Sequence, residues 1–147
     1  MNFSMKDILC KTVATPQELQ AAYKIRHEIF VKEQKLFNKS DRDEYDSRAI
    51  HIVALLEGEV VGTVRVYERD SGVWFGSRLA VQRSCRGRVG GLLVQKAIET
   101  VQELEAKQFF AYVQLHTVSF FKRRRWKPVG EPVDYQRKPH QLMEAPL

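Results

Sequence analysis

The chain has 147 residues, 44% of them hydrophobic, which is enough for one domain with a real core, and we expect residues 1–147 to form it. Its apolar runs are too short to span a bilayer and its start lacks a signal peptide's apolar core, so we expect a cytoplasmic protein without membrane contact. A net charge of +6 favours a polyanionic partner, a class that includes nucleic acid, membrane surfaces and phosphorylated small molecules. Two cysteines and four histidines without ligand spacing argue against a bound metal.

The spacing of apolar residues predicts both strands and helices along the chain. Thr15, Pro16 and Glu18 carry the pattern of a helix start with a capping box, and the strand-like runs on either side of residues 57–59 predict a hairpin. The first half of the chain is expected to begin with a strand over 7–14 and a helix from 16, which ends or gives way to a short second helix at 32–35; a polar acidic loop follows over 38–47. Three strands come next, over 49–56, 60–67 and 73–81, and then a helix after 91. The chain ends with a strand over 109–115, a short helix within 117–125, and closing strands from 126 and over 140–144.

Two of these strands should pair in parallel. A helix lies between strand 73–81 and strand 109–115, and such a strand–helix–strand connection within one sheet is a right-handed parallel crossover. The three strands that end at residue 81 follow one another through tight turns and should be antiparallel. The sequence therefore predicts an α/β fold with one mixed, mostly antiparallel sheet and about four flanking helices.

A basic turn that contains glycines joins strand 73–81 to the long helix. Glycines let a backbone approach a ligand closely, and the first N–H groups of a helix are free to bind an anion. Together with the charges of Arg83, Arg86 and Arg88, this turn predicts a phosphate site. The alternative is an ordinary strand-to-helix loop whose arginines are simply solvated.

In the order of its elements and at this turn, the chain resembles the GNAT superfamily of N-acetyltransferases. The superfamily signature, Arg/Gln-x-x-Gly-x-Gly/Ala, falls on residues 86–91. Arg86 and Gly91 match it, whereas Val89 stands where the first signature glycine is usual. We therefore expect Gly90 to supply the backbone freedom one residue later.

A narrower resemblance, carried by residues 26–34, His51 and residues 139–143, is to the ElaA-like subgroup, and within it to small bacterial N-acetyltransferases linked to nitrogen starvation. The resemblance implies acetyl transfer from acetyl-CoA, as cosubstrate and without a metal, to the primary amine of a small molecule. In the family the two parallel strands splay apart, acetyl-pantetheine lies between them, and the pyrophosphate sits at the helix start. The residues that would bind acetyl-CoA are Leu79, Ala80, Val81, Arg86, Gly87, Arg88, Val89, Gly90 and Gly91.

Aminolysis of a thioester needs a base for the amine proton and benefits from a proton for the leaving thiolate. The family's usual acid is a tyrosine in the short helix after the fifth strand. Here Phe120 and Phe121 occupy that place, and neither has a hydroxyl group that could donate a proton. Solvent is the alternative source, because a thiol of pKa about 8.5 leaves without much help.

His116, at the carboxyl end of strand 109–115, is the first candidate for the base. The alternative is that it caps the next helix or bonds a backbone carbonyl. Glu33, which ends an apolar helix beside the acidic loop, is the second candidate, and its alternative is a structural role.

Asp43, Glu44 and His140 are the candidate acceptor-binding residues. The two carboxylates would attract a cationic amine, although a run of charges is often only solvated. His140 lies in the closing strand, where it either lines the pocket or bonds across strands.

Three functions compete on these observations. An acetyl-CoA-dependent N-acetyltransferase ranks first, with acetyl-CoA and a small amine as its partners. A sensor that holds CoA or acyl-CoA without turnover ranks second, because the usual tyrosine is missing. Nucleic-acid binding, motivated by the net charge and the basic run 122–125, ranks last. The sequence leaves the oligomeric state open, a homodimer included.

Overall fold

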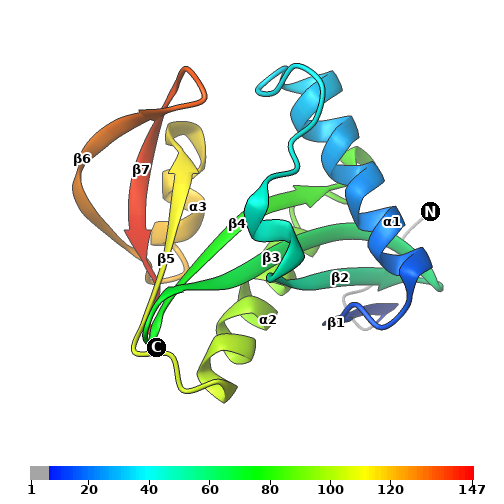
Figure 1. Cartoon of the computed structure of the whole chain (residues 1–147), viewed down its shortest axis with the longest axis horizontal. Helices are drawn as coiled ribbons and strands as arrows, with labels where there is room; N and C mark the ends of the chain where they lie inside the picture. The colour runs from blue at the N-terminus through cyan, green and yellow to red at the C-terminus, as the bar shows by residue number, and fades with distance from the viewer. Residues whose placement is uncertain (1–6) are drawn as a thin grey trace.

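The computed structural model describes residues 7–147, and in them seven strands form a single sheet with the order β1-β2-β3-β4-β5-β7-β6 (Figure 1). The strands are β1 (Ile8–Thr12), β2 (Ile50–Leu56), β3 (Glu59–Asp70), β4 (Val73–Val81), β5 (Gln108–Gln114), β6 (Lys127–Tyr135) and β7 (Lys138–Glu144). The helices are α1 (Pro16–Arg26), which continues as a π-helical segment η2 (His27–Glu33), α2 (Val89–Glu103) and α3 (Val118–Lys122). This is the predicted mixed α/β fold, mostly antiparallel with one parallel pair.

The first helix begins where the capping pattern predicts. The Glu18 N–H donates to Thr15 Oγ1 at 3.1 Å, and the Thr15 N–H donates to Glu18 Oε1 at 3.2 Å. This reciprocal pair satisfies two of the N–H groups that a helix start leaves unbonded. At its other end α1 winds on as the π-helical segment η2, so the short second helix considered at residues 32–35 does not form.

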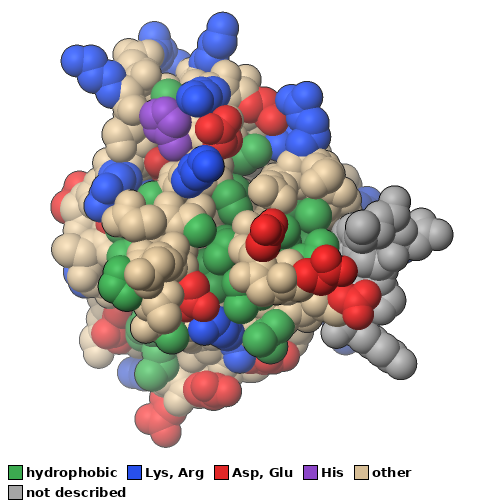
Figure 2. Space-filling view, turned by 90° about the vertical axis from the view of Figure 1, so that its right-hand side faces the viewer, with side chains coloured by type: hydrophobic (Ala, Val, Ile, Leu, Met, Phe, Trp, Pro, Cys, Tyr) green, Lys and Arg blue, Asp and Glu red, His purple; other side chains and the backbone are tan. Residues whose placement is uncertain are grey.

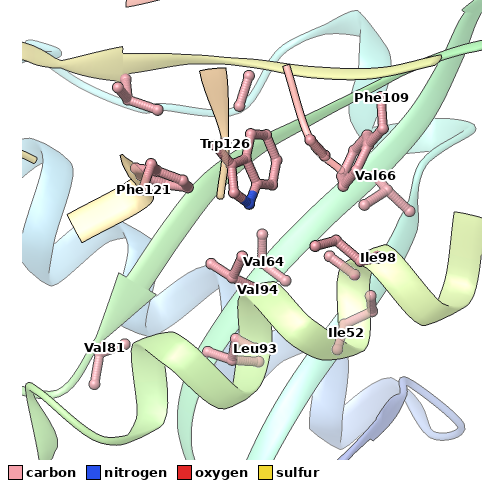
Figure 3. Packing of buried hydrophobic residues seen from close by; sticks show 14 of the residues in the cluster. Ile52, Val64, Val66, Val81, Leu93, Val94, Ile98, Phe109, Phe121 and Trp126 are labelled. Carbon is pink, nitrogen blue, oxygen red and sulfur yellow. The ribbon is translucent and has the colours of Figure 1, made fainter. Parts of the chain in front are cut away.

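The two faces of the sheet carry different chemistry. Successive residues of a strand point to opposite faces, so Val64 and Val66 of β3 belong to the apolar core, whereas Arg65 bonds to the acidic loop on the other side. The apolar core under α2 is shown in Figure 3. In α2, Leu93 and Val101 lie on the buried stripe and are fully inaccessible to solvent. Burial of each such side chain contributes about 1.5–3 kcal/mol.

Two hairpins frame the parallel pair. β2 and β3 form the predicted antiparallel hairpin, with Ile52 opposite Val64. At the other edge β6 and β7 form a second hairpin, and β7 inserts between β5 and β6, antiparallel to both. The strand expected from residue 126 runs from Lys127 to Tyr135, and the strand expected over 140–144 begins earlier, at Lys138.

No helix within residues 7–147 is long and apolar enough to cross a membrane. Figure 2 shows the right-hand side of Figure 1 as a surface. On this face the basic side chains gather at the upper end, and acidic and apolar side chains are mixed in over the rest. This one face thus differs from the continuous basic stripe of nucleic-acid-binding proteins.

Candidate active site

A cleft opens where β4 and β5 part. They pair in parallel only from Val73 opposite Gln108 to Phe75 opposite Phe110, and beyond this point they diverge (Figure 1). The divergence coincides with a bulge in β4: Thr63 faces Ala80 and Arg65 faces Ser77, so two residues of β4 stand opposite Val64 alone. A bulge bends its strand and breaks the regular ladder. The resulting cavity of about 890 Å³ is lined from both strands.

Arg78 is the bulged residue, and its backbone is left-handed with φ of +56°. This conformation is unfavourable for a residue with a Cβ, and it persists only where the surroundings hold it. Four hydrogen bonds fix the side chain: two N–H groups donate to the Asp41 carbonyl at 3.0 and 2.9 Å, one donates to the Tyr135 hydroxyl at 3.0 Å, and one donates to the Asp43 carboxylate at 3.2 Å. The bulge is thus tied both to the acidic loop and to the β6–β7 hairpin.

Six of the nine residues expected to bind acetyl-CoA line this cavity, on β4, on the turn before α2 and in the first turn of α2. These six are Leu79, Ala80, Val81, Arg86, Gly87 and Gly90. The remaining three, Arg88, Val89 and Gly91, are not among its lining residues.

The turn before α2 differs from the expectation in where it bends. The left-handed residue is Gly87, with φ of +99°, and not Gly90, which lies within the first turn of the helix. The expectation for Gly90 was wrong because α2 begins at Val89, one turn before the predicted apolar stripe. Val89 is fully buried in the core, so packing accounts for a valine where the signature has glycine.

Gly91 lies against the end of a side chain and not at a turn, so a larger residue here would require that side chain to shift. A Cβ at this position would lie 2.6 Å from Nη2 of Arg124, whose guanidinium stacks over the Phe120 ring at 3.7 Å. The start of α2 has no side-chain cap, and the N–H groups of its first turn lack carbonyl partners within the helix. A helix start of this kind binds an anion.

Glu33 pairs with the basic turn instead of standing free beside it. Its carboxylate accepts hydrogen bonds from Arg83 at 3.0 Å and from Arg86 at 2.9 Å. The Arg86 bond, with the Arg83 bond after it, lowers the pKa of Glu33 below its usual value. An ionised, doubly paired carboxylate is a poor proton acceptor, so the structure argues against Glu33 as the base.

His116 follows β5 directly, in the turn η5 (Leu115–Thr117) before α3, and its exposed side chain lines the cavity. Neither of the two alternatives considered for it occurs: η5 and α3 have no side-chain cap, and among residues 7–147 no hydrogen bond to its ring is formed. The Gln114 side chain donates to Gln34 Oε1 at 2.9 Å and joins the end of β5 to the end of η2.

His140 lines the same cavity, but its ring is held in place. It is only 3% exposed, its Nδ1 lies 2.9 Å from the Lys138 carbonyl oxygen, and it meets the Tyr135 ring edge-on at 5.1 Å. Of the two alternatives considered for His140, the first holds, since the residue lines the cavity; its side chain bonds to the backbone of its own strand β7 and not across strands.

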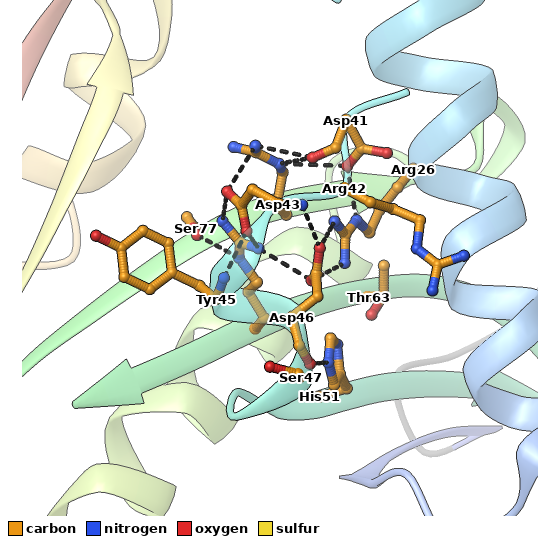
Figure 4. Close-up of polar contacts among 12 residues, drawn as sticks. Arg26, Asp41, Arg42, Asp43, Tyr45, Asp46, Ser47, His51, Thr63 and Ser77 are labelled. Atoms are coloured by element: carbon orange, nitrogen blue, oxygen red, sulfur yellow. Dashed lines mark hydrogen bonds and ion pairs between the residues drawn. The ribbon is translucent and has the colours of Figure 1, made fainter. Parts of the chain in front are cut away.

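Of the two acidic candidates, Asp43 lines the cavity and Glu44 does not. Asp43 binds Arg65 through both oxygens, at 2.6 and 2.8 Å, and also Arg78 at 3.2 Å (Figure 4). Burial raises the pKa of Asp43, but the bonds and charge of Arg65 outweigh this effect and hold it below its usual value. Glu44 is exposed on the turn η3 (Glu44–Ser47), so the geometry does not support it as an acceptor ligand.

The acidic loop forms a balanced ionic cluster, which sequence reasoning missed. Arg26 binds Asp46 at 2.8 and 3.0 Å and Asp41 at 2.7 Å, and Arg65 binds Asp46 at 2.9 Å (Figure 4). The cluster contains three arginines and three aspartates, namely Arg26, Arg65, Arg78, Asp41, Asp43 and Asp46. Its charges cancel, so the cluster presents no spare negative charge to a cationic amine. The sequence signal that could have indicated this cluster is Arg65, an arginine within the apolar run of β3.

His51 is buried beside this cluster, as expected for a core histidine. Its Nε2 lies 3.0 Å from the Asp46 carbonyl oxygen, and burial lowers the pKa of His51.

On the cavity side, four aromatic rings form a nearly parallel row across the sheet, with ring centroids 4.2, 6.2 and 6.0 Å apart. These rings are Tyr45, Tyr67, Phe75 and Tyr112. In the described part of the chain no group of three or more His, Cys, Asp or Glu could hold a metal ion.

Comparisons with known proteins agree with this geometry. The uncharacterized N-acetyltransferase YjcF of Bacillus subtilis is 28% identical over 128 residues, which cover 86% of this chain and 89% of that protein. The crystal structure of Escherichia coli ElaA superposes with a TM-score of 0.84 at 24% identity, over 95% of this chain and 99% of that one. A GNAT family acetyltransferase from Elizabethkingia anophelis with acetyl-CoA bound superposes with a TM-score of 0.71 at 13% identity, over 96% and 99%.

At these identities the two solved structures show a shared fold. The family itself follows from the sequence: a model described as the acetyltransferase (GNAT) family matches residues 17–125. That stretch runs from α1 through α3 and so contains both strands of the cleft and the basic turn. The chain therefore belongs to the GNAT family of acetyltransferases.

Proposed function

We propose that this protein is an N-acetyltransferase that moves the acetyl group of acetyl-CoA directly to the primary amine of a small molecule. The observation that carries the proposal is the cleft between β4 and β5, which ends at the uncapped start of α2. Acetyl-CoA is bound to the Elizabethkingia relative of the same fold, which supports CoA as the cosubstrate. The single sheet that contains every described strand supports one catalytic domain.

In this proposal the acyl-pantetheine arm lies along the unpaired edge of β4. Leu79, Ala80 and Val81 line the cavity, and on the side of β4 that faces β5 their backbone has no partner strand beyond the point where β5 diverges. The pyrophosphate binds the N–H groups at the start of α2, and Arg86 turns from Glu33 to a phosphate oxygen. Arg88, Val89 and Gly91 contribute through the backbone of that first turn.

The chemistry follows from the groups on the cavity wall. The amine nitrogen attacks the thioester carbonyl, a C–N bond forms, the C–S bond breaks, and CoA leaves as a thiolate. His116, exposed at the cavity and without a fixed partner in the described residues, accepts the amine proton. Phe120 and Phe121, at the place of the family's tyrosine, have no hydroxyl, so the thiolate takes its proton from solvent.

The acceptor lies on the side of the cavity that faces the acidic loop. The row of four aromatic rings and His140 provide an apolar wall there, and the paired Asp43 provides carboxylate oxygens at its edge. Such a wall suits an amine attached to a flat or apolar body. We place the chain in the ElaA-like subgroup on the residues quoted for it, and its link to nitrogen starvation stays a prediction.

The experiment is an incubation with acetyl-CoA and a broad panel of primary amines, in which released CoA thiol is measured. We expect thiol release with at least one amine and binding of CoA in a calorimetric titration. The missing tyrosine favours a second candidate, a sensor that binds CoA or acyl-CoA without turnover. Binding without thiol release for any amine would support the sensor, and absence of both would overturn the proposal.

A further inference from the structure

The indole of Trp126 is buried with an unused hydrogen-bond donor. The residue is 4% exposed, and its ring packs between Phe109 and Phe121, with centroids 5.4 and 5.1 Å away. Its Nε1 is inaccessible to solvent and has no hydrogen-bond partner in residues 7–147. Buried N–H groups without a partner are rare in native proteins, because their desolvation is not offset.

The residue that carries the unused donor lines the cleft. Trp126 lines the cavity together with Val64 of β3 and Val94 of α2, and Figure 3 shows the indole nitrogen directed toward these two side chains. Neither valine side chain has an acceptor, so these neighbours offer nothing to this N–H. Within residues 7–147 the other buried side-chain atom without a partner, Nδ1 of His51, belongs to a residue that does not line the cavity.

The chemistry of the donor restricts what can satisfy it. An indole Nε1 can only donate, so its partner must be an acceptor such as a carbonyl oxygen, and cations and N–H groups are excluded. The ring is clamped by its two aromatic neighbours, so the donor is already oriented before a ligand arrives. Packing alone would be served by a phenylalanine, which has no polar atom to desolvate.

We propose that Trp126 Nε1 donates a hydrogen bond to a carbonyl oxygen of the acyl-pantetheine arm of the CoA cosubstrate. This inference rests on the proposed function, because it requires that the arm enters the cleft between β4 and β5. The arm carries two amide carbonyls and, when acylated, a thioester carbonyl, all of which are suitable acceptors. Trp126 is thus a binding residue for the donor substrate, and it transfers no proton.

Proton–nitrogen NMR of the indole groups tests the proposal directly. The chain has two tryptophans, and Trp74→Phe identifies which of the two Nε1–H resonances belongs to Trp126. Saturation with acetyl-CoA should move the Trp126 resonance downfield, whereas 3′,5′-ADP, which lacks the arm, should leave it in place. An equal movement with both ligands, or none at saturating acetyl-CoA, would overturn the proposal.

Two further ligands identify the oxygen. Desulfo-CoA keeps the amide carbonyls, so a shift equal to that with acetyl-CoA assigns the bond to an amide. A shift that requires acetyl-CoA assigns it to the thioester carbonyl, and either result supports the proposal.

Trp126→Phe keeps an aromatic ring and removes the donor. We expect it to weaken acetyl-CoA binding by about threefold to tenfold in calorimetry and to leave 3′,5′-ADP binding unchanged. Trp74→Phe is the matched control, because Trp74 is not among the residues that line the cavity, and it should change neither affinity. Failure of the wild-type protein to bind acetyl-CoA would refute the proposed function itself, whereas acetyl-CoA binding that leaves the Trp126 resonance unmoved would refute only this inference.

Discussion

The ionic cluster under the acidic loop makes a quantitative prediction for Asp46→Asn. The Asp46 side chain is 6% exposed and accepts hydrogen bonds from Arg26 and from Arg65. Asparagine keeps the shape, but it removes the charge and turns an NH₂ donor toward the guanidinium groups. The cluster then holds three arginines and two aspartates in a buried place.

Removal of one partner from a buried ion pair costs about 3–5 kcal/mol, because a charge remains buried without compensation. In a protein of this size 1 kcal/mol corresponds to roughly 2–4 °C, so the melting temperature should fall by roughly 6–20 °C. Urea unfolding at neutral pH, followed by tryptophan fluorescence, measures the loss in free energy. Glu44→Gln, an exposed change in the same loop, is the control and should cost less than about 0.5 kcal/mol. An Asp46→Asn protein as stable as the wild type would refute this account of the cluster.

The same cluster gives the wild-type protein a defined response to acid. Burial raises the pKa of Asp46, but the bonds from Arg26 and the neighbouring charges hold it well below its usual value of 3.8. Because the folded-state pKa is depressed, ionised Asp46 stabilises the fold above pH 3.8, and this stabilisation is lost as the pH falls toward the folded-state pKa. The Asp46→Asn protein lacks this contribution, so its free energy of unfolding should fall less steeply below about pH 4.

Three further changes test the cleft. Arg86→Glu should weaken CoA binding at least about tenfold by calorimetry, since a phosphate contact is replaced by repulsion, and it should barely change the melting temperature. The control is Lys39→Glu, a charge reversal on the exposed loop, which should leave the affinity for CoA unchanged. His116→Ala should lower turnover by about 100-fold or more and spare CoA affinity, and turnover with an unchanged pH profile would remove His116 as the base. Glu33→Gln should tighten CoA binding by up to about fivefold, because Arg83 and Arg86 are released from their carboxylate partner; weaker binding would show that Glu33 positions the arginines instead.

The sequence predicted well what depends on neighbouring residues. The capping box at Thr15 and Glu18 is a contact over three residues, and the apolar stripe of α2 needs only a helical period. The parallel pairing of β4 with β5 followed from the crossover helix between them. Each of these features is set by short-range chemistry or by a topological rule.

The parts that could not be predicted depend on residues far apart in the chain. The left-handed backbone of Arg78 is held by Asp41 and by Tyr135, which are 37 and 57 positions away. The sequence left Glu33 open as a base or as a structural residue. Its pairing with Arg86, 53 positions away, lowers the pKa of its carboxylate and makes it a poor base. Spacing carries no information about contacts of this kind, so the acceptor side was the least predictable part of the site.

A crystal structure of the protein with acetyl-CoA tests the central claim most directly. We predict that the pantetheine arm lies between β4 and β5, that the pyrophosphate meets the start of α2, and that Arg86 has left Glu33 for a phosphate oxygen. Acetyl-CoA bound elsewhere on the surface, with the cleft empty and the Glu33–Arg86 pair intact at saturating ligand, would contradict the account.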